Sequence, residues 1–303
     1  MNGFPKGARV CFLGDSITHN NGFLSRIVDY YHTNLKERGV NFFNCGVSGG
    51  NLRTLLAIFE DDVLIHNPTH AVIMIGMNDS ARYFLQDLPR GKERYDKLLN
   101  AFETYKERLS TICDKLEAIG AEIIMCTPTP YDEYQDSATY AYKGGFALLA
   151  AYAEYVRSFA KERGYKLCDY HTYISKVAQY EPIISPDRVH PNVDGHYHIA
   201  KCFLEFQGFD IGENKPIPEY LSEWRTKVEK IRTIHATEDM VVQDYTLSTE
   251  ERIEKIKKYL ENPPASPYIE TFVAYSKRYL EDKPHQKQLM ADIDRLMEVE
   301  FKK

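Results

Sequence analysis

Four short segments carry the residue types that a serine-dependent hydrolysis requires. They are Gly14-Asp15-Ser16-Ile17, Gly46-Val47-Ser48-Gly49-Gly50, Gly76-Met77-Asn78-Asp79 and Asp187-Arg188-Val189-His190. A serine hydroxyl is a weak nucleophile until a neighbouring base takes its proton, and histidine has a pKa suited to that exchange. A carboxylate three residues before the histidine can reach its ring and stabilise the charged imidazolium. We therefore predict Ser16 as nucleophile, His190 as general base and then acid, and Asp187 as the residue that orients His190.

The same segments offer hydrogen-bond donors for the oxyanion of a tetrahedral intermediate. Catalysis of acyl transfer needs such donors where negative charge develops. The backbone N–H groups of Ser16 and Gly49 and the side-chain amide of Asn78 could supply three of them. Glycine suits this task because no side chain shields its N–H and because it tolerates unusual backbone angles.

Four further residues are predicted to contact substrate. Asp15 lies within the first segment, although it could instead cap the helix that follows, and Arg53 comes shortly after the second, although it could equally face solvent. Tyr131 and Tyr134 belong to the tyrosine-rich segment 128–145, which we expect to be a long loop after a strand, and such loops often form binding walls. A tyrosine combines an apolar face with a hydroxyl, which suits a sugar ring, although these rings could instead pack on the next helix.

The segment Gly46-Val47-Ser48-Gly49-Gly50 supports a competing assignment. It matches the G-x-S-x-G pattern of the nucleophile elbow in α/β-hydrolases, which would make Ser48 the nucleophile. That fold requires several strands before its elbow. Here only one predicted strand, residues 8–13, comes before the strand that leads into this segment. We therefore favour Ser16 over Ser48.

A cluster of histidines raises the question of a metal. His190, His196 and His198 lie close in sequence to Asp194. Histidines two positions apart point to different sides of a helix, and hydrolysis by serine and histidine needs no metal. We predict no metal and no other cofactor. His19 lies near Ser16 and could line the site, but we expect it on the surface.

The elements that would position these segments follow an alternating pattern. Strand-like apolar runs occupy residues 8–13, 41–45, 71–75, 122–126 and 165–168. Helical periodicity fills the intervals over residues 24–35, 98–116, 146–159 and 197–206. Alternation of strands and helices predicts a doubly wound α/β fold with a parallel sheet. Ligands of such sheets bind at the carboxyl ends of the strands, where the candidate segments could converge.

The pattern changes after Gly212, where only helical periodicity remains. We predict two parts, a hydrolase domain of residues 1–212 and a helical C-terminal extension of residues 213–303. Ser248 and Glu251 resemble a capping box at the start of one helix. An apolar stripe at Leu289, Ile293 and Leu296 is more often core than partner surface, so we expect the extension to pack against the sheet. A homo-oligomer formed through these helices and a cover over the active site are the alternatives.

Composition excludes several classes of protein. The chain has 303 residues, a formal net charge of −6 and a pI near 6.0, which argue against a nucleic-acid partner. The longest apolar runs fall far below the ~20 residues of a membrane span, and the N-terminus lacks the features of a signal peptide. The six cysteines follow no metal-binding spacing, so we expect buried reduced thiols in a cytoplasmic protein.

At the four segments the sequence resembles the SGNH hydrolases, also called the GDSL esterase/lipase family. Ser16 matches the family's nucleophile, and Gly49 and Asn78 match its oxyanion residues. Asp187 and His190 match its closing D-x-x-H motif. The resemblance implies a carboxylic ester hydrolase that works through an acyl-enzyme and needs no cofactor.

The resemblance covers roughly residues 8–207 and implies a flavodoxin-like three-layer α/β/α sandwich with the five-stranded sheet order 2-1-3-4-5. The family's GDSL reads GDSI here, a change at a packing position. Within the family we favour short-acyl esters, foremost acetyl groups on O-acetylated carbohydrates, because no long apolar loop suggests a tunnel for an acyl chain. A lysophospholipase or acyl thioesterase is the alternative enzyme. A non-catalytic binding module is the alternative outside enzymes.

Overall fold

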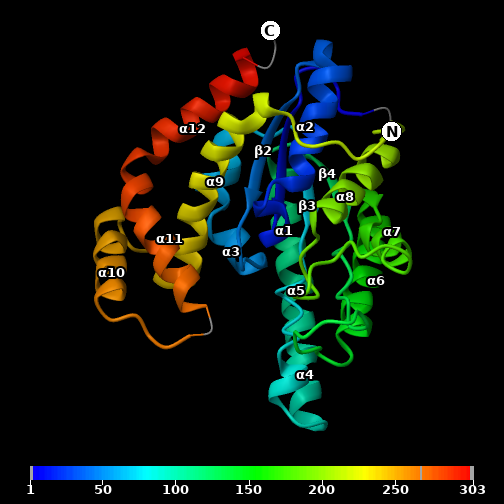
Figure 1. The fold of residues 1–303 in the computed structure, drawn as a ribbon, viewed down its shortest axis with the longest axis vertical. Coiled ribbons are helices and arrows are strands. Elements are labelled where there is room, and N and C mark those ends of the chain that lie inside the picture. Colours follow the sequence, from blue (N-terminus) through cyan, green and yellow to red (C-terminus); the bar gives the residue numbers. More distant parts are fainter. Residues whose placement is uncertain (1–2, 267, 301–303) are drawn as a thin grey trace.

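A five-stranded parallel sheet forms the centre of the molecule (Figure 1). The computed structural model describes residues 3–266 and 268–300. The strands are ordered β2-β1-β3-β4-β5, and every neighbouring pair is parallel, as predicted. Their bounds are β1 (Arg9–Gly14), β2 (Asn41–Gly46), β3 (His70–Met74), β4 (Glu122–Cys126) and β5 (Lys166–Cys168). All five predicted strand runs are confirmed to within one residue at each end.

Helices cover both faces of the sheet and complete the predicted three-layer sandwich (Figure 1). One face is covered by α2 (Gly22–Asn34), α7 (Tyr170–Val177) and α8 (Val193–Phe206). The other is covered by α3 (Leu52–Ala57), α5 (Lys92–Ala118) and α6 (Gly145–Arg163). Shorter turns are α1 (Ser16–His19), α4 (Phe84–Asp87), η1 (Lys36–Arg38), η2 (Phe59–Val63), η3 (Leu64–His66), η4 (Glu219–Leu221), η5 (Glu238–Val242), η6 (Lys283–His285) and η7 (Leu296–Glu300).

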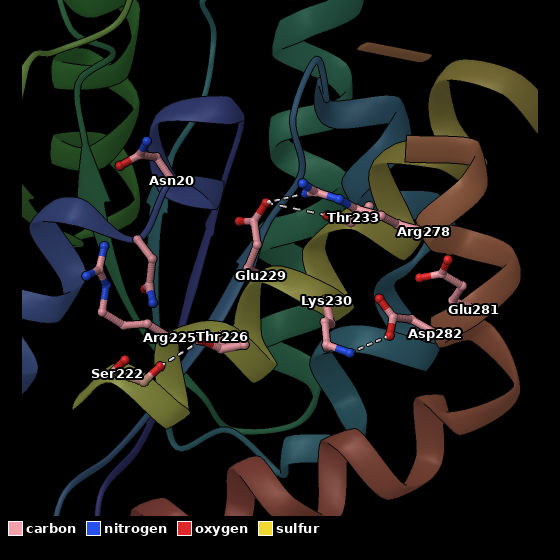
Figure 2. Close-up of a pocket in the computed structure, with 11 residues that line it drawn as sticks. Asn20, Ser222, Arg225, Thr226, Glu229, Lys230, Thr233, Arg278, Glu281 and Asp282 are labelled. Carbon is pink, nitrogen blue, oxygen red and sulfur yellow. Dashed lines mark hydrogen bonds and ion pairs between the residues drawn. The ribbon is translucent and has the colours of Figure 1, made fainter. Parts of the chain in front are cut away.

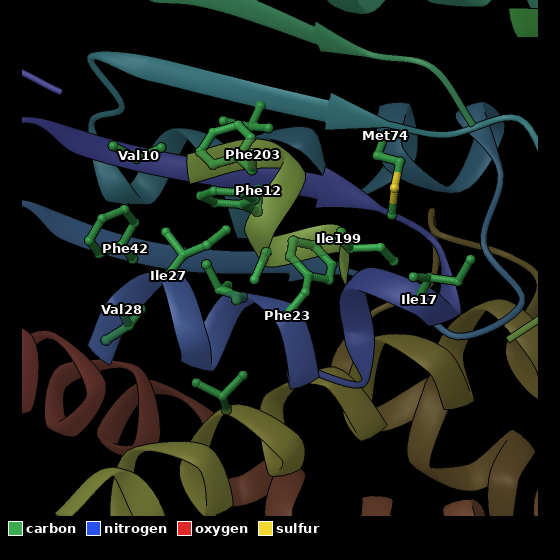
Figure 3. Packing of buried hydrophobic residues seen from close by; sticks show 14 of the residues in the cluster. Val10, Phe12, Ile17, Phe23, Ile27, Val28, Phe42, Met74, Ile199 and Phe203 are labelled. Atoms are coloured by element: carbon green, nitrogen blue, oxygen red, sulfur yellow. The ribbon is translucent and has the colours of Figure 1, made fainter. Parts of the chain in front are cut away.

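Strand side chains divide between the two layers because successive residues point to opposite faces. On β1, Val10 and Phe12 face α2 and α8, whereas Cys11 and Leu13 face α3 and α5. Figure 3 shows the first of these layers, where the Phe12 ring packs against those of Phe23 and Phe203, with centroid distances of 6.1 and 5.6 Å. Each buried phenylalanine contributes roughly 1.5–3 kcal/mol of transfer free energy, so this layer fixes α2 and α8 firmly on the sheet.

The described part of the C-terminal extension is helical, as predicted. It contains α9 (Ser222–Thr237), α10 (Thr249–Glu261), α11 (Ile269–Asp282) and α12 (Gln286–Arg295). The capping box of Ser248 and Glu251 begins α10. Ile293 and Leu296 are buried in the same hydrophobic core as α2 and α8, which confirms the core assignment of this stripe.

The extension lies beside β2, the edge strand of the sheet (Figure 1). A buried ion pair links the extension to the hydrolase domain. Both terminal nitrogens of Arg232 on α9 donate to the Asp62 carboxylate of η2, one of them at 2.6 Å. Burial alone would raise the pKa of Asp62, but Arg232 and His235 hold it far below its usual range. Removing one partner of such a pair leaves a buried charge uncompensated, which typically costs ~3–5 kcal/mol.

Two further expectations concern the chain as a whole. All six cysteines are unpaired and buried, in agreement with the prediction of buried thiols. No helix within residues 3–266 and 268–300 is long and apolar enough to cross a membrane.

Candidate active site

The four candidate segments converge at the carboxyl ends of the strands. Ser16 begins α1 directly after β1, and residues 47–51, here called the glycine loop, follow β2. Asn78 follows β3 and donates its side-chain amide to the Gly50 carbonyl at 2.8 Å. His190 lies in the loop before α8 and reaches Ser16 across 174 residues of sequence. The topology therefore assembles what the sequence could only place on separate strands.

Ser16, His190 and Asp187 form a hydrogen-bonded relay. The Ser16 Oγ lies 2.7 Å from His190 Nε2, and His190 Nδ1 lies 2.6 Å from Asp187 Oδ2. The second carboxylate oxygen of Asp187 accepts the backbone N–H groups of Val189 and His190 at 3.0 and 2.9 Å. Because Nδ1 binds Asp187, the other ring nitrogen, Nε2, faces the serine hydroxyl.

The two ionisable partners of the relay shift one another's pKa. Burial would raise the pKa of Asp187, but its hydrogen bonds from the His190 ring and from backbone N–H groups lower it to about 2. The hydrogen bond to Asp187 raises the pKa of His190, against the opposing effect of burial. The carboxylate is thus charged at neutral pH and makes His190 a stronger base.

The loop that carries His190 is held by an arginine. Arg188 is 4% exposed, has a left-handed backbone (φ 70°) and donates to the carbonyls of Thr139, Gln135 and Ser137 at 2.9, 2.8 and 3.0 Å. These bonds join the catalytic loop to the tyrosine-rich segment. Asn192 then caps α8 by accepting the Gly195 N–H. Fixed on both sides, His190 has little freedom to leave Ser16.

Two of the three predicted oxyanion donors are unused. Among the described residues, neither the Ser16 nor the Gly49 backbone N–H has a hydrogen-bond acceptor. Gly49 is exposed and has φ 76°, a conformation that disfavours other residues. Asn78 has one amide hydrogen on Gly50 and a second left for a ligand.

Two carboxylates lie beneath the site. Asp15, which we predicted to contact substrate, is 3% exposed and accepts the Ile17 N–H at 3.0 Å as the cap of α1. Burial raises its pKa. Asp79 accepts the Leu52 N–H at 3.0 Å, and burial raises its pKa to about 7. Asp15 thus holds the start of α1, and Asp79 holds the start of α3. The burial of Asp15 argues against the predicted direct contact with substrate.

The other predicted substrate contacts have varied surroundings. Arg53 pairs with Asp239 of η5 at 3.1 Å and remains part-exposed. Tyr131 is 1% exposed, and its hydroxyl accepts the Tyr142 N–H at 2.9 Å, whereas Tyr134 is 79% exposed. Both tyrosines line a cavity of about 620 Å³, whose lining in the described chain includes neither the nucleophile nor its base. Their roles toward substrate stay predictions.

One charged side chain near the relay was missed by the sequence analysis. Arg82 donates to the Met77 carbonyl at 2.6 Å and lies over the rings of Tyr131 and Tyr142, each 6.0 Å from the guanidinium carbon. Its charge lowers the pKa of His190, although less than Asp187 raises it. The only sequence signal was a basic residue shortly after Asn78 in the same loop.

Ser48 and the remaining histidines have other surroundings. The Ser48 backbone N–H donates to His19 Nδ1 at 3.2 Å, so this histidine is committed to the main chain of the glycine loop. His19 is 5% exposed, which corrects the expected surface position. His196 is buried against Phe23, while His198 reaches Glu181 at 3.2 Å. Within the described chain, no group of three or more histidine, cysteine or acidic residues could hold a metal ion.

The fold and the site define a class of protein. Residues 12–197 match the GDSL-like Lipase/Acylhydrolase family, which covers more than half of the chain. The chain belongs to this family of hydrolases, as its four segments indicated.

Individual relatives extend the comparison. An acetylxylan esterase of Geobacillus stearothermophilus is 28% identical over an alignment of 221 residues, which covers 67% of this chain and 95% of that protein. The crystal structure of Axe2, an acetylxylan esterase of the same organism, aligns with a TM-score of 0.57 and 26% identity over 71% of this chain and 100% of that chain. A gut microbial diltiazem-metabolizing enzyme shares the fold over 100% of this chain and 97% of its own, with a TM-score of 0.74 and 16% identity.

Proposed function

We propose that this chain hydrolyses short-acyl carboxylic esters, foremost acetyl esters of carbohydrates, through an acyl-enzyme on Ser16. The observation that carries the proposal is the relay itself, with 2.7 Å between Ser16 Oγ and His190 Nε2 and 2.6 Å between His190 Nδ1 and Asp187. A serine within hydrogen-bond reach of an oriented base is the arrangement that acyl transfer requires.

In the first half-reaction, His190 takes the hydroxyl proton as Ser16 Oγ attacks the ester carbonyl carbon. The carbonyl oxygen becomes an oxyanion, which the N–H groups of Ser16 and Gly49 and the Asn78 amide stabilise. Asp187 stabilises the imidazolium by holding its Nδ1–H. His190 then gives its proton to the leaving alcohol oxygen, the carbon–oxygen bond breaks, and the acyl group remains on Ser16.

In the second half-reaction, water replaces the alcohol. The water oxygen attacks the acyl carbon while His190 takes a proton from the water. The N–H groups of Ser16 and Gly49 and the Asn78 amide then stabilise the second oxyanion. The proton returns to Ser16 Oγ as the acid departs. Every proton in the cycle passes through Nε2 of His190, so the step depends on this nitrogen facing the serine.

The acyl and alcohol preferences rest on different support. The sequence similarity to an acetylxylan esterase supports an acetyl group on a sugar. The exposed Tyr134 and the part-exposed Phe146 beside the 620 Å³ cavity offer aromatic faces of the kind that sugar rings contact.

The test compares wild type, Ser16→Ala and Ser48→Ala on p-nitrophenyl acetate, with circular dichroism as a check on folding. Loss of activity in Ser16→Ala alone supports the proposal, and loss in Ser48→Ala alone would replace it with the nucleophile-elbow mechanism. A series of p-nitrophenyl esters from acetate to longer acyl chains then tests the acyl group. Activity that rises with chain length would favour a lipid-acyl or thioester hydrolase.

Labelling with a fluorophosphonate separates an enzyme from a binding module. The reagent should modify wild type and spare Ser16→Ala, because only an activated serine reacts. Acetylated xylooligosaccharides test the sugar, and release of acetate from them at a rate above that from p-nitrophenyl acetate would support a carbohydrate substrate.

A further inference from the structure

We propose that the C-terminal extension positions the glycine loop, so that the helices outside the hydrolase domain set the placement of the Gly49 N–H in the oxyanion hole. This inference rests on the proposed function, because it assigns a task to residues that serve the same site. It stands on three contacts, each made by a different part of the extension, with residues 47–54 or with His19, which binds Ser48.

The first contact runs through His19. Its Nδ1 accepts the Ser48 N–H at 3.2 Å, which places the ring hydrogen on Nε2. That nitrogen lies 3.5 Å from Glu229 of α9. Burial would raise the pKa of Glu229, but the imidazole beside it lowers the value on balance. A carboxylate of the extension thus lies beside the histidine that holds the main chain next to Gly49.

The second contact is made by α11. The Tyr275 ring stacks on His19, with a centroid distance of 6.4 Å and an interplanar angle of 6°. Burial raises the pKa of Tyr275, and the nearby Ser48 side chain opposes that shift. The tyrosine therefore restrains both the histidine and the loop residue that this histidine binds.

The third contact is made by η5. Asp239 is 8% exposed and accepts hydrogen bonds from Thr54 at 2.8 Å, Tyr245 at 2.9 Å and Arg53 at 3.1 Å. Thr54 also closes the capping box with Asn51, which ends the glycine loop and starts α3. A buried carboxylate of the extension therefore holds the end of the loop opposite to Ser48.

Gly49 itself lies close to the extension. A methyl group built on Gly49 would lie 3.0 Å from Met240 Cε, and Val47 packs in one hydrophobic cluster with Met240 and Tyr275. By contrast, Ser16 is held within the hydrolase domain by the start of α1. Asn78 donates to Gly50 of the glycine loop, so the extension acts directly on Gly49 and, through Gly50, indirectly on Asn78.

A polar cavity adjoins the contact between Glu229 and His19. Figure 2 shows this cavity of about 570 Å³ between Asn20 and the helices α9 and α11, with Glu229, Lys230 and Arg278 in its lining. Three basic and three acidic side chains line it, so their charges balance. Glu229, which lines this cavity, is the residue that lies 3.5 Å from His19.

The experiment compares Tyr275→Ala with Ile293→Ala, a control that loosens the extension in the core away from the loop. We expect Tyr275→Ala to lower kcat on p-nitrophenyl acetate about 10-fold, part of the ~10²–10³-fold cost of losing an oxyanion donor, with KM within twofold. An alkyl trifluoromethyl ketone, which forms a tetrahedral adduct, should bind more weakly by the same factor. Tyr275→Phe keeps the stacking and should recover most of the loss. Ile293→Ala should keep kcat within twofold.

A double-mutant cycle links the effect to Gly49. Once Gly49→Ala has displaced the N–H, adding Tyr275→Ala should change kcat less than twofold, because neighbours acting through one group are not additive. Full additivity, or an equal loss of kcat in Ile293→Ala, would overturn the proposal.

Amide hydrogen exchange of residues 47–51 separates this inference from the proposed function. Tyr275→Ala should speed exchange in this loop relative to Ile293→Ala, whether or not the chain hydrolyses the test ester. Unchanged exchange would overturn the positioning role while leaving a Ser16-dependent activity intact. An inactive wild type with faster loop exchange in Tyr275→Ala would instead count against the proposed function alone.

Discussion

Replacing Asp79 by asparagine should change how stability depends on pH. Asp79 Oδ2 is shielded from solvent and has no hydrogen-bond partner among the described residues, and burial raises the pKa of this carboxyl from 3.8 to about 7. The folded protein therefore keeps a proton that the unfolded chain releases above pH 4. Stability falls as pH rises through this window, since the folded state binds more protons there.

The magnitude follows from the two pKa values. Between pH 5 and pH 8, ionisation of Asp79 should cost the folded state on the order of 2–3 kcal/mol. The asparagine of the variant cannot ionise, and its amide oxygen can still accept the Leu52 N–H. The stability of Asp79→Asn relative to wild type should therefore rise by that amount from pH 5 to pH 8. Any cost of the new amide hydrogens is independent of pH and cancels in the comparison.

Urea unfolding at both pH values measures this difference. Circular dichroism follows the whole chain, and fluorescence follows Trp224, the single tryptophan, which is buried on α9. Coincident transitions would justify a two-state treatment. Asp87→Asn, at an exposed position of α4, is the matched control. A relative stability of Asp79→Asn that stays constant between pH 5 and pH 8 would refute the argument.

Three further predictions concern catalysis. Asn78→Ala should lower kcat by ~10²–10³-fold with the fold intact by circular dichroism, since it removes one oxyanion donor, and a loss below threefold would contradict that role. The kcat/KM profile should rise through a midpoint above the ordinary 6.5 of histidine, because the hydrogen bond to Asp187 raises the pKa of His190; a flat profile from pH 5 to 8 would exclude His190 as the base. Asp187→Asn should lower this midpoint and Arg82→Gln should raise it, as steady-state rates against pH would show, and shifts of the opposite sign would refute the assigned electrostatics.

The sequence was sufficient to predict the framework of the fold. Runs such as Ala71 to Ile75 are almost wholly apolar because both faces of β3 are buried, and this pattern distinguishes a central parallel strand. The candidate residues followed from chemistry and from their place after strands. The parallel sheet then brought Ser16 and His190 together, since the carboxyl ends of its strands share one edge.

Contacts between distant segments were beyond the reach of sequence periodicity. The stripe on α12 predicted burial but could not show that Tyr275 stacks on His19 or that Asp239 binds Thr54. His19 was expected on the surface because a lone histidine carries no signal of its partners, and its partner Glu229 lies far along the chain on α9. Asp15 was assigned to substrate from proximity to Ser16, although a residue before a helix often caps it, as it does here.

The position of the extension beside β2 has a consequence for solubility. An edge strand exposes unpaired backbone groups that can recruit a strand from another molecule. Here α9 and η7 lie against β2, and Arg232 approaches the Gly46 carbonyl at 3.4 Å. A chain that ends at residue 212 would retain every residue of the relay. It would, however, expose β2 and the apolar surface that Trp224 and Ile231 cover. We expect such a fragment to aggregate, which would mean that the helices of the extension also prevent self-association of the sheet.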